Sequence, residues 1–148
     1  MSPAGVEMFL DCHYRLCRLT NEMLPYGQTL FSALLYLSRL EAVLIMDDLE
    51  TLKPSGLTGS KPCFVGAPSR LVDVVSRIVS RIGAELPENS RSIMASQLFI
   101  VALKRFRIAA SDDVLQSYYS MIDEAGNAMK IPRGKRAHDR GVMGAMDR

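Results

Sequence analysis

Two consecutive helix patterns with a sharp break between them occupy residues 96–123, and they constrain the fold more than any other part of the sequence. The first pattern is apolar and ends in Phe106-Arg107-Ile108, and the second begins at Ser111-Asp112-Asp113. Serine is a favourable N-cap, and the two aspartates suit the positive start of a helix. No catalytic motif lies in this stretch, so its information concerns helices and their packing.

Apolar residues recur at helical spacing in five segments, which predict an all-α fold. Proline and glycine separate these segments, as at Pro25, Pro87 and Gly126. The second segment begins apolar on most sides, which is typical of a central, buried helix. Residues 71–75 alone also fit a buried strand, but the longer period around them favours a helix. The predicted helices cover residues 5–24, 28–52, 69–86, 90–107 and 111–125.

Composition predicts one compact domain followed by a basic tail. The chain has 148 residues, of which 48% are hydrophobic and 23% charged, enough to bury a core. We expect a helical domain over residues 1–129 and a flexible tail over 130–148. The tail has a net charge of +4, so the remainder has −2. The candidate binding residues of the tail are Lys130, Arg133, Lys135 and Arg136. Their candidate ligands are nucleic acid, an acidic protein and a membrane surface, and a nuclear import signal is a further interpretation.

Compartment is inferred from three features of the sequence. No apolar run is long enough to cross a membrane, and the first residues do not form a signal peptide. Three cysteines at irregular spacing favour a reducing compartment, where thiols act as small core residues. We therefore expect an intracellular protein without a membrane association.

Candidate catalytic and metal sites are weak. Cys12 and Cys17 lie about 140° apart on a helix, which is poor geometry for one metal ion, so core packing is the favoured interpretation. The run 56–61 departs from a phosphate-binding loop in its glycine spacing and in the proline after Lys61. A nucleophile needs a base, and only His13 and His138 are available. We therefore predict no catalytic residue, no cofactor and no metal, and not an enzyme.

Two further segments are candidates for function. Residues 53–68 contain three prolines and three glycines, and this length is unusual for a loop in a compact domain, so the segment is expected to be functional, inserted or mobile. Arg70, Arg77 and Arg81 share the polar face of the third predicted helix. Arginine favours protein interfaces through its planar fork, whereas ordinary solvated charge is the alternative.

The order of these helices resembles the cyclin box, in particular the phosphate-signalling type of cyclin. The run 33–40 resembles the second cyclin-box helix, and Ser69-Arg70-Leu71 resembles the start of the third. Residues 79–85, 106–108 and 111–119 resemble later parts of the same fold, so the likeness covers about residues 25–123. It implies a cyclin-box-like arrangement around a central second helix, and an up-down helical bundle is the alternative.

The resemblance also implies partner-binding residues. A third-helix lysine and a fourth-helix glutamate contact the kinase in cyclins, and the matching positions here are Arg81 and Gln97. Arginine keeps the charge with a different geometry, whereas glutamine loses it. The 53–68 loop is longer than the usual cyclin link.

Three function classes follow from these observations. The first is a non-enzymatic helical protein-protein interaction module, for which the resemblance implies a cyclin-like regulatory or adaptor subunit of a protein kinase. The second is a helical protein that associates with nucleic acid through the basic tail. The third is a self-associating assembly protein, since nine methionines and several large apolar residues suit a sticky surface.

Overall fold

The chain folds into helices, and no strand occurs among the residues that the structure describes. This structure is a computed structural model that describes residues 1–53, 55–60, 66, 69–88 and 92–124. A sixth helix, over residues 111–124, follows five others. The basic tail residues Lys130, Arg133, Lys135 and Arg136 lie outside the described residues. The first five helices are α1 (Pro3–Thr20), α2 (Tyr26–Ser38), α3 (Ala42–Glu50), α4 (Leu71–Glu85) and α5 (Ala95–Ile108).

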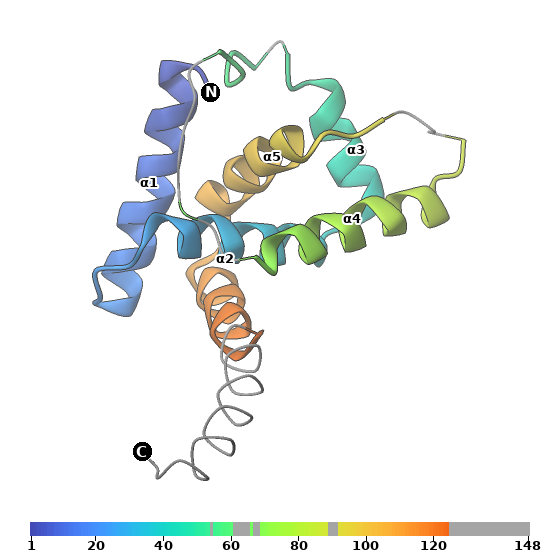
Figure 1. The fold of residues 1–148 in the computed structure, drawn as a ribbon. Coiled ribbons are helices and arrows are strands. Elements are labelled where there is room, and N and C mark those ends of the chain that lie inside the picture. The colour runs from blue at the N-terminus through green and yellow to red at the C-terminus, as the bar shows by residue number, and fades with distance from the viewer. Residues whose placement is uncertain (54, 61–65, 67–68, 89–91, 125–148) are drawn as a thin grey trace, which may run out of the picture.

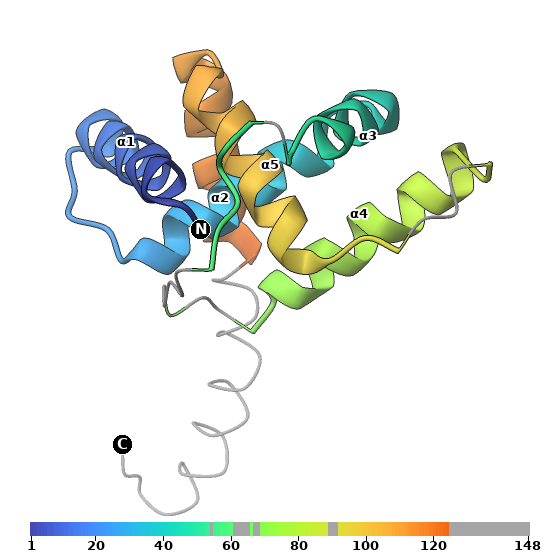
Figure 2. The same ribbon diagram turned by 90° about the horizontal axis from the view of Figure 1, so that it is seen from above.

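Helices α2 and α5 form the centre of the fold. Figure 1 shows α5 between α1 and α3, and Figure 2 shows α2 beneath them. Helix α2 also packs against α1 and α4, and it buries residues on nearly all sides, including Phe31, Leu34 and Leu37. The second helix thus contacts several others, and α5 shares the centre of the fold with it. Helices α2 and α4 run across their neighbours, and one core cluster draws on all six helices.

The second predicted helix, over residues 28–52, is wrong as a single element. It is divided into α2 and α3, and the two helices are bent by 118° at the break between them. The Ser38 hydroxyl donates to the Leu35 carbonyl at 2.6 Å, and Glu41 takes an extended conformation before α3 begins. Burial of α3 against α5 and α4 favours this bend over a straight continuation. The described residues therefore contain six helices and not five.

The acidic end of this segment is held to α5. Asp48 is buried with only 5% of its surface exposed. Its carboxylate is paired with Arg105 and Lys104 of α5. Asp47 and Glu50 point outward and are exposed.

Helix α4 confirms the amphipathic pattern and excludes the strand alternative for residues 71–75. Leu71, Val74, Ile78 and Ile82 are buried at helical spacing. The helix begins at Leu71 and not at Ser69, and no side chain caps its start. The next helix begins later than the pattern predicts, because Met94 is still extended.

The chain start is fixed by part of the 53–68 loop. The Ser2 amide donates to the Leu57 carbonyl at 3.2 Å, and the Ser2 hydroxyl donates to the Gly56 carbonyl at 2.6 Å. The fit is close, since a Cβ atom added at Gly5 would lie 2.6 Å from the Leu57 oxygen. Leu57 itself is buried. The described part of this loop therefore packs on the start of α1.

The turn between α5 and the sixth helix is stabilised from α1. The Arg15 guanidinium donates to the carbonyls of Phe106 and Arg107 at 3.3 and 3.2 Å, and to the Ser111 hydroxyl at 3.3 Å. A cation suits the negative C-terminal end of a helix. The helix that begins at residue 111, as the sequence predicts, is thus held to two others.

Candidate functional site

The arginine face of α4 is mostly occupied by contacts within the chain. Arg77 pairs with Glu124 of the sixth helix, with Nη2 and Oε1 3.1 Å apart. Arg81 pairs with Glu85 on its own helix at 3.7 Å. Arg70 is exposed, and its guanidinium makes no ion pair or hydrogen bond among the described residues. Of the three predicted partner-binding arginines, Arg70 alone thus has an uncommitted guanidinium in this part of the chain.

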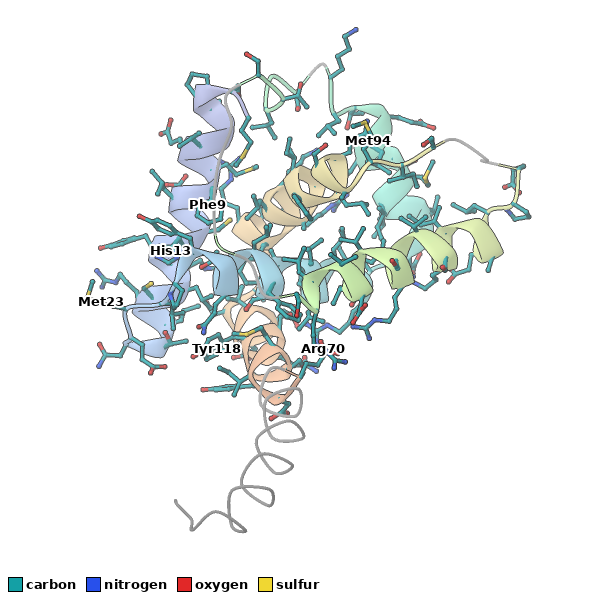
Figure 3. All side chains as sticks on the ribbon, viewed as in Figure 1. Phe9, His13, Met23, Arg70, Met94 and Tyr118 are labelled. Atoms are coloured by element: carbon teal, nitrogen blue, oxygen red, sulfur yellow. The ribbon has the colours of Figure 1, made fainter. Side chains whose placement is uncertain are left out.

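Gln97 lies apart from Arg70 and has a local role. Its Oε1 accepts a hydrogen bond from the Met94 amide at 3.0 Å, which satisfies a free donor at the start of α5. Met94 and Arg70 lie apart in the view of Figure 3, and no hydrogen bond among the described residues joins the side chains of Arg70 and Gln97. Gln97 also lines a cavity of about 350 Å³ whose other walls include Phe9, Leu30 and Phe99.

A second surface, which the sequence interpretation missed, lies where α1 turns into α2. We define the corner patch as Leu10, Tyr14, Met23 and Tyr26, four large side chains that are each about half exposed or more. Tyr14 is 63% exposed and Met23 is 100% exposed. An apolar hollow of about 350 Å³ lies in the patch and is lined by Leu10, His13, Tyr14, Cys17, Met23 and Leu24. Exposed apolar clusters of this kind are typical of binding surfaces.

His13 stands at the edge of this hollow and links α1 to α2. Its Nδ1 lies 2.6 Å from the Thr29 hydroxyl, and its Nε2 lies 3.6 Å from the Cys17 sulfur. The ring stacks on Phe9 and meets Tyr26 edge to face. Burial lowers the pKa of His13 below its ordinary value of 6.5, so the imidazole is neutral at neutral pH. Figure 3 shows Phe9 and His13 along α1, with Met23 at its end.

The two cysteines of α1 have different environments. Cys12 is buried and donates from its sulfur to the Leu103 carbonyl at 3.3 Å, as the core-packing interpretation predicts. Burial raises the pKa of the Cys12 thiol to about 12. Cys17 is only partly buried and opens onto the hollow. Core packing therefore describes the environment of Cys12, whereas Cys17 also borders the apolar hollow.

The described residues contain no group of three or more histidine, cysteine, aspartate or glutamate side chains placed to hold a metal ion. Within the same residues no single helix is long and apolar enough to cross a membrane, although α2 and α3 pass that test together as a bent pair. Comparisons with protein-family models, with curated proteins and with solved structures found no match. The site is therefore interpreted from its own geometry.

Proposed function

We propose that this chain is a helical protein-protein interaction module that binds an apolar segment of a partner through the corner patch. One observation carries the proposal: Leu10, Tyr14 and Met23 line one apolar hollow while a large part of their surfaces stays exposed, and the half-exposed Tyr26 packs against His13 beside it. Tyrosine and methionine are enriched in protein interfaces, and the hollow is large enough to receive a bulky side chain.

The surroundings of the patch suit a protein ligand. Arg18 and Glu22 lie at its edge and are exposed, so a polar rim of both signs borders an apolar centre. This arrangement matches the general form of a protein interface. A nucleic-acid ligand fits the patch less well, because the described surface here is not a basic stripe.

The test is capture of partners by the full-length protein. We expect the double variant Tyr14→Ser/Met23→Ser to lose partners that the wild type retains, because the apolar anchor is removed. The matched control is Val72→Ser/Ile108→Ser, which removes two largely exposed apolar side chains from α4 and α5. Equal capture by both double variants would reject the corner patch as the binding surface. Sedimentation of the wild type tests a second copy of this chain as the partner.

The cyclin-like interpretation is a narrower form of the same proposal. The resemblance implies a protein kinase as the partner, with contacts from Arg81 and Gln97. Arg81 and Arg77 already pair within the chain, but both remain partly exposed at the surface of α4. Recovery of a kinase by the wild type, and its loss with Arg81→Glu, would support a cyclin-like regulatory subunit. Capture of partners that include no kinase would support the interaction module and reject the cyclin-like function.

A further inference from the structure

Cys17 lies between two hollows of different character. The apolar hollow, with Leu10 and Leu24 in its wall, lies on one side. A second hollow of about 460 Å³ lies on the other side, where Arg18, Asn21 and Glu22 supply polar groups. Cys17, Tyr14 and Met23 line both. A molecule held at Cys17 would therefore place an apolar part on one side and a polar part on the other.

The His13 imidazole lies beside the Cys17 thiol as a base, and the Thr29 hydroxyl orients that imidazole. Nε2 of His13, one helical turn earlier, lies 3.6 Å from the sulfur. Nδ1 of the same ring lies 2.6 Å from the hydroxyl of Thr29, which is fully buried on α2. When Nδ1–H donates to the Thr29 oxygen, the Nε2 lone pair faces the thiol. A nucleophile, a base and a third group that orients the base form the arrangement that activates thiols.

We propose that Cys17 is an S-acylation site that takes an acyl group directly from a long-chain acyl thioester. The apolar hollow would receive the acyl chain, and the polar hollow would receive the carrier. The apolar and polar parts of one acyl thioester then match the apolar and polar hollows on the two sides of Cys17. The acyl chain would occupy the same apolar hollow as the proposed partner segment, but the acylation site rests on a separate observation, the contact of Cys17 with His13.

The reaction is a thioester exchange. The Cys17 sulfur attacks the carbonyl carbon and forms a new carbon–sulfur bond, while its proton passes to Nε2 of His13. The tetrahedral intermediate collapses with cleavage of the bond to the carrier sulfur, and His13 returns the proton to the leaving thiolate. The products are acylated Cys17 and the free carrier thiol, and no oxidant or reductant is required. Thr29 contributes as a positioning residue through the imidazole.

The experiment uses full-length protein with Cys63→Ser, so that Cys12 and Cys17 are the remaining thiols. Palmitoyl-coenzyme A is the probe, and the products are measured by intact mass and peptide mapping. We expect one acyl group on Cys17, released by hydroxylamine, and none on Cys12, which is the internal control on the same helix. His13→Gln should slow the initial rate about a hundredfold, the usual contribution of a general base.

A second pair of variants keeps the test valid if His13→Gln perturbs folding. Thr29→Val keeps the shape but removes the hydroxyl, and Thr29→Ser restores it, so the rate should fall in the first and recover in the second. Acetyl-coenzyme A should react more slowly than the palmitoyl thioester, because it leaves the apolar hollow empty. Acylation of Cys12, no acylation, equal rates with the two thioesters, or full activity in both His13→Gln and Thr29→Val would overturn the proposal. Partner capture is measured separately, so the failure of either proposal is distinguishable from the other.

Discussion

The guanidinium of Arg105 holds the buried carboxylate of Asp48 with two hydrogen bonds, Nε to Oδ2 at 2.5 Å and Nη2 to Oδ1 at 3.0 Å. Lys104 is a second cation at this carboxylate, with its Nζ 3.5 Å from Oδ1 of Asp48. A buried carboxylate is costly unless it is paired and hydrogen-bonded. The pair also raises the pKa of Arg105, chiefly through the hydrogen bond to Asp48. It thereby permits α3, which carries an inward acidic residue, to pack on α5.

Replacement of Arg105 by alanine is expected to lower the free energy of unfolding by about 3 kcal/mol, because it leaves a buried carboxylate without its main partner. The matched control is Arg107→Ala on the same helix. Arg107 pairs with Asp11 at 3.8 Å, and both side chains are largely exposed. Such a surface pair contributes less than about 1 kcal/mol. Urea unfolding of the two variants measures the difference, and equal losses would contradict the structural role of the buried pair.

The sequence predicted the class of the fold and the last helix start, but not the number of helices. Periodicity marks which residues are buried in α2 and α4, because a one-sided or all-round apolar pattern is a local property. The bend after Ser38 has no proline or glycine to mark it. It depends on the packing of α3 and on the pairing of Asp48 with Arg105, residues 57 positions apart. A contact over that distance leaves no trace in a local pattern.

The amphipathic pattern of α4 gives a direct test of burial. Val74 is 0% exposed, whereas Val72, on the same helix, is 65% exposed. Val74→Ala should cost about 2 kcal/mol, from two lost methyl groups and the cavity that they leave. Val72→Ala should change stability by less than about 0.5 kcal/mol. Thermal unfolding of both variants checks this, and similar effects would mean that α4 is packed on a different face.

The candidate site was only partly visible in the sequence. His13 and Cys17 are four residues apart, so a helix places them on one face, and this spacing is the signal that the interpretation passed over. Thr29 belongs to another helix, and its contact with His13 depends on the turn between α1 and α2. The exposure of Met23 and Tyr26 likewise follows from that turn. Apolar residues beside a predicted helix are ordinarily assigned to a core, which conceals such a patch.

Stability should depend on pH through His13. Burial lowers the pKa of this imidazole in the folded state, so the unfolded chain binds the proton more readily. The corresponding stability is fully present above the ordinary value of 6.5 and is lost as the pH falls below it. We expect the melting temperature of the wild type to fall more steeply than that of His13→Gln over this range. Parallel pH profiles for the two proteins would show that His13 is not the group responsible.

Arg39, in the break between α2 and α3, is expected to stabilise the sixth helix. Its Nη2 donates to the hydroxyl of Ser117, which is fully buried, at 2.6 Å and to the Asp113 carbonyl at 3.3 Å. Its guanidinium also lies over the Tyr36 ring, 5.8 Å from the centre. Arg39→Met keeps most of the apolar stem and removes the donors, so Ser117 loses the partner that this guanidinium provides.

The expected cost of Arg39→Met is about 1.5 kcal/mol, at the lower end of the range for a hydrogen bond with a charged group. If the loss is local, amide hydrogen exchange in residues 111–124 should accelerate about tenfold, while exchange in the middle of α2 changes little. Arg70→Met is the matched control, because the Arg70 guanidinium has no ion pair or hydrogen bond among the described residues. An equal effect of both variants, or no effect of Arg39→Met, would show that contacts other than those of Arg39, such as the packing of Tyr118 and Met121, hold this helix in place.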